Sequence, residues 1–136
     1  MSFSERIRRI WTPAIAAHIA EGRRGEDIAA RYLRDHDYRI IDRNVRIGRD
    51  EIDIIAYDPI DRVLIFAEVK TRTRADDDYR PELNITHKKR ARMSRAARRY
   101  MAKSRVDDDV GYRLDVLCVA DGTVIEHYPE VAWTNG

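Results

Sequence analysis

The sequence predicts a single α/β domain in which one mixed β-sheet is flanked by helices. Apolar residues recur first with a helical period, then alternate in three segments, then recur helically again and finally alternate in two segments. Turn-forming residues separate the alternating segments. The length of 136 residues suits one domain with one core. The predicted order of elements is therefore α-β-β-β-α-β-β.

The first helical segment spans residues 13–36. Pro13 suits the first turn of a helix, whereas Gly22 and Gly25 interrupt the helical pattern. The segment is therefore predicted to form one interrupted helix or two short helices. In its second part, residues 26–36, apolar residues recur every three or four positions and form one face that can be buried.

The next three segments predict strands. Residues 38–47 and 51–57 alternate on either side of a turn sequence at 48–50, which is typical of an antiparallel hairpin. A second turn sequence at 58–61 precedes residues 62–71. This last segment is the most apolar of the three, so we expect it to lie centrally in the sheet.

The remaining segments predict a loop, a helix and a hairpin. Residues 73–84 are polar and contain three consecutive aspartates, which predicts an acidic loop that could repel a polyanion or gate its access. Thr86 can cap the following helix, which is expected to end near Lys103. Residues 112–120 and 123–128 form two further strand segments, joined by an Asp-Gly pair that favours a tight turn.

The composition excludes several classes of protein. Charged residues make up 37% of the chain and hydrophobic residues 43%, which indicates a folded domain with a highly charged surface. The single cysteine, Cys118, cannot form an internal disulfide and is expected to be a buried small side chain. No apolar segment is long enough to span a bilayer, so we expect a cytoplasmic protein without a membrane partner. We interpret residues 1–21 as an N-terminal extension and residues 22–128 as the core of the single domain, 1–136.

Three charged residues in apolar strands mark a candidate active site. Glu68 and Lys70 are two residues apart in a strand and therefore project from the same face, among apolar neighbours that make isolated charges costly. Asp53 lies in the preceding strand, and pairing of the two strands could bring its carboxylate beside Glu68. Two adjacent carboxylates repel each other unless a cation or a proton intervenes.

A hard divalent cation, Mg²⁺ or Mn²⁺, suits such a pair of carboxylates. These ions bind carboxylate and carbonyl oxygens, which the side chains of Asp53 and Glu68 and the backbone carbonyl of Val69 can supply. Lys70 could then orient a water molecule or stabilise negative charge on a phosphate. The alternative is structural: Glu68 and Lys70 form a salt bridge on a solvated face, and Asp53 pairs with a surface arginine.

A basic helix is the second candidate functional feature, because residues 86–105 contain no Asp or Glu. Lys89 lies between its apolar and cationic sides and could point toward the candidate site, and Arg72, on the same face as Lys70, could bind a phosphate. A cationic stripe of this kind is typical of phosphate-backbone binding, although it also suits a solvated helix face. The cationic stripe consists of Lys88, Arg92, Arg95, Arg99 and Lys103. The apolar side of the same helix consists of Met93, Ala96, Ala97, Tyr100 and Met101.

The order of these features resembles the PD-(D/E)XK nuclease superfamily, in which an acidic helix residue precedes an Asp on a hairpin strand and a Glu-x-Lys on the next strand. More narrowly, the chain is similar to the YraN-like family of bacterial proteins over roughly residues 22–119. One difference is Asp50, where that family usually has Gly. The matching features are Gly25-Glu26 with Ala30 and Leu33, Asn44, Glu51 to Ala56, Phe66 with Glu68-Val69-Lys70, Arg72, Lys89 and Arg113 to Val116.

The resemblance implies a restriction-endonuclease-like mixed sheet flanked by helices. It further implies that Asp53 and Glu68 are metal ligands, that Lys70 is the catalytic lysine and that Glu26 approaches the site from the first helix. Glu26 lies at the edge of the apolar face of its helix, which agrees with that role. An acidic residue in a first helical turn would also favour the helix dipole, so this alternative stays open.

The leading hypothesis is a Mg²⁺- or Mn²⁺-dependent endonuclease that hydrolyses phosphodiester bonds in nucleic acid, DNA rather than RNA. The similarity to junction-resolving enzymes suggests branched or damaged DNA as the substrate. The competing hypothesis is a nucleic-acid-binding module on a nuclease fold with little or no catalytic activity. A further alternative is that the chain acts only as a homodimer or with a partner, because cutting two strands generally needs two sites.

Overall fold

The computed structural model describes residues 13–72 and 87–129, and its elements follow the predicted order. The predicted acidic loop at 73–84 and the predicted cap at Thr86 lie outside the described residues. The elements are α2 (Pro13–Asp35), β1 (Arg39–Ile47), β2 (Asp50–Asp58), β3 (Val63–Thr71), α3 (His87–Lys103), β4 (Gly111–Ala120) and β5 (Thr123–Tyr128).

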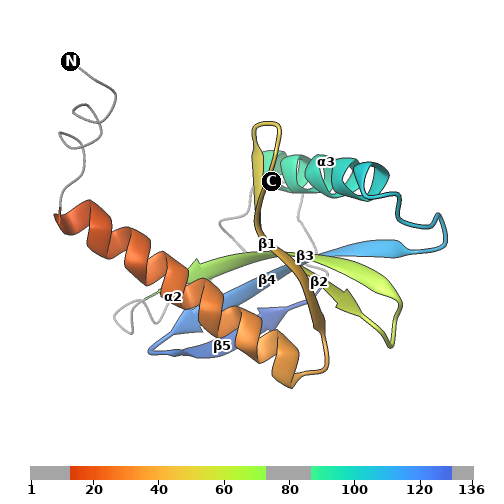
Figure 1. Ribbon diagram of the computed structural model, residues 1–136. Helices are drawn as coiled ribbons and strands as arrows, with labels where there is room; N and C mark the ends of the chain where they lie inside the picture. The colour runs from red at the N-terminus through yellow and green to blue at the C-terminus, as the bar shows by residue number, and fades with distance from the viewer. Residues whose placement is uncertain (1–12, 73–86, 130–136) are drawn as a thin grey trace, which may run out of the picture.

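The strands form one five-stranded mixed sheet in the order β1-β2-β3-β4-β5 (Figure 1). Three pairs of neighbours are antiparallel, whereas β3 and β4 are parallel. A parallel pair needs a long connection, and α3 lies within it. Helix α2 covers one face of the sheet and α3 the other (Figure 1). The structure thus confirms the α/β class and the central position of β3.

Helix α2 is continuous, so the predicted interruption at Gly22 and Gly25 is wrong. A glycine within a helix costs only about 1 kcal/mol relative to alanine, which tertiary packing can offset. Gly25 is buried, and a Cβ there would lie 2.4 Å from Oγ1 of Thr71. The missing side chain therefore allows α2 to approach the end of β3 closely, next to Glu26. Residues 13–21 belong to this same helix and continue into the core without a break.

Two hydrophobic clusters hold the layers together. On one face, Ala29, Ala30 and Leu33 of α2 pack against apolar side chains of β2, β3 and β4. On the other face, Met93 and its helical neighbours pack against Ile52, Phe66 and other strand residues. The apolar side predicted for the basic helix is the side that packs, and Cys118 is buried as expected. Both faces of the central strands are covered, which explains their nearly continuous apolar sequences.

A buried ion network stabilises the α2 face of the sheet. Asp115 is fully buried and accepts hydrogen bonds from Nε and Nη2 of Arg113 at 2.8 and 3.0 Å. Nε2 of His127 lies 2.7 Å from Oδ2 of Asp115, and its Nδ1 lies 3.3 Å from the Tyr32 hydroxyl. The pKa of Arg113 is raised, mainly by its hydrogen bonds to Asp115. The network therefore joins β4, β5 and α2 through the polar contacts of Asp115, His127 and Tyr32.

Replacing Asp115 with Asn should lower the free energy of unfolding by about 3 kcal/mol, because it removes the main partner of a buried guanidinium. Urea unfolding monitored by circular dichroism measures this loss. The matched control is Asp109→Asn, which breaks a pair with Arg62 in which the side chains are 66% and 68% exposed. That control should cost less than about 1 kcal/mol. Equal losses in the two variants would contradict a stabilising role for the buried network.

Candidate active site

Asp53 lies where strand β2 separates from strand β3. The two strands pair as far as Ile54 and Ala67. Beyond that point, Oδ2 of Asp53 accepts a hydrogen bond from the backbone N–H of Val69 at 2.8 Å. A side-chain carboxylate thus takes the place of a strand acceptor and is held in the gap between the two strands.

The carboxylate of Glu68 contacts two lysines. Nζ of Lys70 lies 3.1 Å from Oε1 of Glu68, and Nζ of Lys89 lies 2.6 Å from the same atom. Lys70 shares a strand face with Glu68, as their spacing predicts. Lys89 comes from the first turn of α3 and points toward the site, as its position at the edge of the apolar side predicts. The Glu68 side chain is only 13% exposed, so these contacts are partly shielded from water.

Burial and negative neighbours raise the pKa of Asp53 to about 7. Desolvation of the carboxylate is the largest cause, and the charges of Glu68 and Glu26 raise the pKa further. The hydrogen bond from Val69 and the charge of Lys89 oppose this shift. Asp53 is therefore a largely buried carboxylate with negative neighbours, and a cation bound there would favour its ionised form.

Glu26 approaches this site from α2. Burial raises its pKa, which a hydrogen bond from Asn44 and the charge of Arg43 oppose. The influence of Glu26 on Asp53 shows that the two carboxylates lie within electrostatic reach. The alternative role in a first helical turn is wrong, because α2 begins at Pro13 and has no acidic residue in its first turn.

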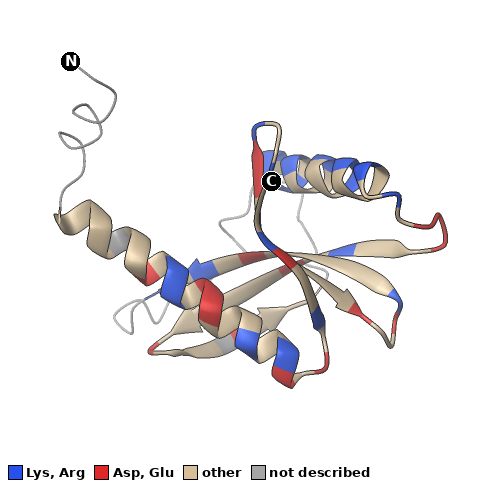
Figure 2. Cartoon of the chain, viewed as in Figure 1, with Lys and Arg blue, Asp and Glu red and all other residues tan. Residues whose placement is uncertain are grey.

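The predicted basic stripe lies on the exposed side of α3, where Figure 2 shows Lys and Arg and no acidic residue. Four of its five members are exposed without a carboxylate partner among the described residues: Lys88, Arg92, Arg99 and Lys103. Arg95 differs, because its Nε and Nη2 donate to Asp50 at 3.1–3.2 Å. Asp50 is 7% exposed and begins β2 instead of lying in the predicted turn. The Asp50–Arg95 pair therefore joins the β1–β2 hairpin to α3.

Arg72 does not lie in the cavity beside Glu68 and Lys89. Its N–H donates to the Val119 carbonyl at 2.9 Å, and it lines a separate cavity of about 190 Å³ with Glu21 and Arg24 of α2. Strand β3 ends at Thr71, so the alternation that predicted a shared face with Lys70 no longer applies. The predicted role of Arg72 in binding a phosphate stays a prediction.

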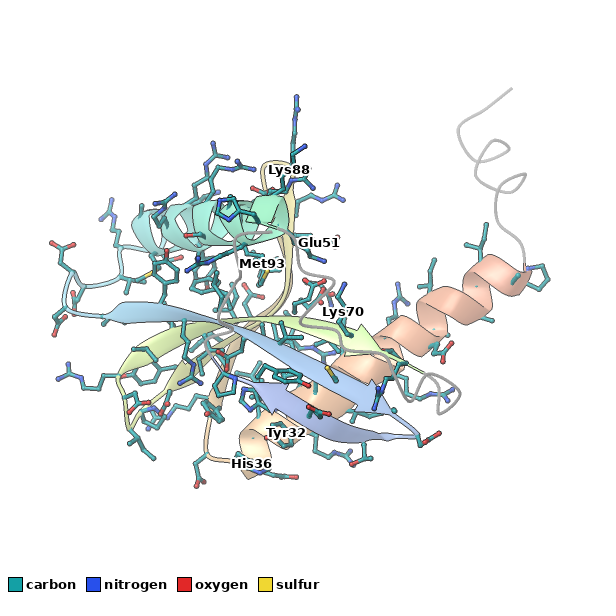
Figure 3. The ribbon with its side chains drawn as sticks, turned by 180° about the vertical axis from the view of Figure 1, so that it is seen from behind. Tyr32, His36, Glu51, Lys70, Lys88 and Met93 are labelled. Atoms are coloured by element: carbon teal, nitrogen blue, oxygen red, sulfur yellow. The ribbon has the colours of Figure 1, made fainter. Side chains whose placement is uncertain are left out.

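A cavity of about 210 Å³ opens beside Glu68, between the tip of the β1–β2 hairpin and the first turns of α3. In Figure 3, Glu51, Lys70 and Met93 lie toward the α3 side of the sheet, whereas Tyr32 and His36 lie on the opposite side. Sequence reasoning missed Arg49, which lines this cavity, because it was assigned only to a turn. The sequence held one indication that Arg49 could belong to the site: it lies four residues before Asp53, in the turn that leads into the same strand.

The candidate site offers a small set of oxygen donors to a divalent metal ion. Among residues 13–72 and 87–129, no group of three or more His, Cys, Asp or Glu side chains could hold a metal ion. The donors would be the Asp53 and Glu68 carboxylates and the Val69 carbonyl. Mg²⁺ is commonly held by one or two carboxylates and keeps several waters, so a pair of carboxylates is sufficient for it.

The mixed sheet, its two flanking helices and the clustered Asp53, Glu68 and Lys70 define an α/β domain with a nuclease-like fold. The chain belongs to the uncharacterised protein family UPF0102, whose model matches residues 25–119. UPF0102 is the YraN-like family, so the predicted family resemblance is confirmed. The matched region includes every residue of the candidate site from Glu26 to Lys89.

Relatives in several bacteria share this sequence over most of their length. A UPF0102 protein of Chlorobaculum parvum is 46% identical over 106 residues, which cover 77% of this chain and 78% of the relative. UPF0102 proteins of Syntrophotalea carbinolica and Chlorobium limicola are 42% and 40% identical, and the matches cover 87% and 91% of those relatives.

No helix within the described residues is long and apolar enough to cross a membrane.

Asp53→Asn should raise the melting temperature of the metal-free protein at pH 8. The folded-state pKa of about 7 lies above the ordinary value of 3.8 for an aspartate, so the ionised group destabilises the fold increasingly as pH rises from about 4 to 7. The gain should approach zero at pH 4, and each 1 kcal/mol should appear as about 4 °C in a domain of this size. Thermal melts at pH 4, 6 and 8 measure the effect, with the exposed Asp42→Asn as control. A pH-independent gain would contradict the assigned cause.

Proposed function

We propose that this protein is a Mg²⁺- or Mn²⁺-dependent nuclease that hydrolyses phosphodiester bonds in DNA. The observation that carries the proposal is the pair of carboxylates, Asp53 and Glu68, with the ammonium of Lys70 3.1 Å from Glu68. Burial and the charge of Glu68 raise the pKa of Asp53, and a bound cation would favour the ionised carboxylate. The UPF0102 match over residues 25–119 covers all of these residues.

Each residue of the cluster has a distinct part in the proposal. Asp53 and Glu68 would hold the cation, and the Val69 N–H fixes the orientation of Asp53. A bound Mg²⁺ or Mn²⁺ supplies Lewis acidity toward a phosphoryl oxygen and lowers the pKa of a bound water. Lys70 carries a positive charge beside these groups and would stabilise charge developing on the phosphate. Glu26 would add a further carboxylate from α2.

Nucleic acid is supported as the substrate by the position of the basic helix. The exposed face of α3 carries lysines and arginines, and its first turn supplies Lys89 to the carboxylate site. Cations that contact phosphates release counterions, so affinity independent of base sequence is expected to fall with added salt. The placement of this face beside the carboxylates supports substrate binding more strongly than a basic helix alone would.

One observation favours a second candidate, a nucleic-acid-binding module without catalytic activity. The ammonium of Lys89 lies 2.6 Å from Glu68, closer than that of Lys70, and Lys89 lines the same cavity as Glu68. If Lys89 keeps this position when nucleic acid binds, it neutralises Glu68 in place of a metal ion. The nuclease proposal requires that a divalent cation compete successfully with Lys89.

A cleavage assay tests the proposed activity. The protein is incubated with branched, single-stranded and duplex DNA and with RNA, in Mg²⁺, in Mn²⁺ and in chelator. Cleavage of DNA should require the metal and should fall by about 100-fold or more in Asp53→Ala and in Lys70→Ala, because each removes a charged group from the reacting centre. Asp42→Ala and Arg39→Ala are exposed controls on β1 and should retain activity. Absent cleavage, or cleavage that survives both substitutions, would exclude the nuclease.

Metal binding has a readout that does not depend on activity. Mn²⁺ should raise the melting temperature progressively with its concentration, because binding stabilises the folded state by about 2.7 kcal/mol at 100 times the dissociation constant. Asp53→Ala and Glu68→Ala should abolish this shift. Lys89→Met should increase the affinity for Mn²⁺, because it removes the competing ammonium from Glu68. A shift only in Lys89→Met would favour the binding module, and no shift in any variant would exclude the metal site.

A further inference from the structure

The cavity beside Glu68 has two walls that come from distant parts of the sequence. One wall is the tip of the β1–β2 hairpin, which contributes Arg49 and Glu51, and the other is α3, which contributes Lys89 and Arg92. The volume of about 210 Å³ is below the usual range of about 300–1,000 Å³ for pockets that enclose a whole small molecule. The cavity therefore suits one part of a longer ligand.

The charges that line this cavity are unequally compensated. Asp50 is paired with Arg95, and Glu68 is paired with Lys70 and Lys89. Arg49 and Arg92 are exposed and form no ion pair with any carboxylate among the described residues. Glu51 opposes them from the exposed side of the hairpin. The cavity thus presents two available guanidinium groups next to the carboxylate site.

The structure also fixes where Arg49 is presented. Gly48 adopts a φ of +62°, a conformation that side chains rarely allow, and a Cβ there would lie 3.1 Å from Nη1 of Arg99. Asp50, on the other side of Arg49, accepts the hydrogen bonds of Arg95. Asp50 thus binds α3 and Gly48 lies close to it, so Arg49 projects from a segment beside α3 and lines the same cavity as Arg92.

We propose that Arg49 and Arg92 form a phosphate-binding subsite for a nucleic-acid strand. The subsite would hold a phosphate that flanks the bond placed over Asp53 and Glu68, and in this respect it rests on the proposed function. Guanidinium groups suit this task because their parallel N–H donors match the oxygens of a phosphate. The Asp50–Arg95 pair has a positioning role, since it holds the hairpin from which Arg49 projects.

Binding in the absence of metal tests the subsite separately from catalysis. Fluorescence anisotropy with labelled oligothymidylate in chelator gives the dissociation constant at several salt concentrations. The Arg49→Ala/Arg92→Ala double variant should bind at least 10-fold more weakly. The slope of log affinity against log salt should become shallower by about 0.7, because the variant loses the contact with one phosphate of a single strand.

The matched control is Arg62→Ala/Arg39→Ala, which removes two exposed arginines away from the cavity. This control should change the affinity by less than twofold. Asp50→Asn should weaken binding only in a protein that retains Arg49, which separates positioning from direct contact. Equal effects of the two double variants, or no binding by the unaltered protein, would overturn the subsite.

The outcomes also separate this proposal from the nuclease proposal. If the unaltered protein never cleaves but the salt slope falls in the Arg49→Ala/Arg92→Ala variant, the nuclease fails and the subsite stands. If the unaltered protein cleaves and the double variant keeps its affinity and KM, the subsite fails and the nuclease stands.

Discussion

The hydrogen bond from the Val69 N–H to the Asp53 carboxylate is the interaction on which the candidate site depends. Two antiparallel strands normally satisfy their backbone groups with each other, so a side chain can enter the ladder only where the strands separate. Strand β2 separates from β3 directly after the Ile54–Ala67 pair, and Asp53 then supplies the acceptor. The Val69–Asp53 hydrogen bond therefore holds a carboxylate in the gap between β2 and β3, beside Glu68.

Placing carboxylates together in a partly buried setting requires compensation from other elements. Lys70 comes from the same strand as Glu68, and Lys89 comes from α3 on the far side of a long connection. Glu26 adds negative charge from α2, where the buried Gly25 allows the helix to lie close to β3. Helices α2 and α3, on opposite faces of the sheet, therefore both contribute charged side chains near Asp53 and Glu68. The buried Arg113–Asp115–His127 network lies on the α2 face and stabilises the sheet that presents the site.

The hairpin between β1 and β2 connects the site to the basic surface. Its tip is held against α3 by Asp50 and Arg95, so two cationic elements that are separate in sequence become adjacent. Arg95 thereby contributes to the architecture, whereas Arg49 and Arg92 remain available to a ligand. Arg95 takes this part because its Nε and Nη2 donate to the carboxylate of Asp50 at the start of β2.

The sequence alone determined the order of the elements, the central position of β3 and the shared face of Glu68 and Lys70, because these follow from apolar periodicity and from alternation within one strand. It did not determine that α2 runs through Gly22 and Gly25, since packing against β3 outweighs the weak helical preference of glycine. It also could not place Arg72 or pair Arg95 with Asp50. Those outcomes depend on where a strand ends and on contacts between distant segments, which only the tertiary structure decides.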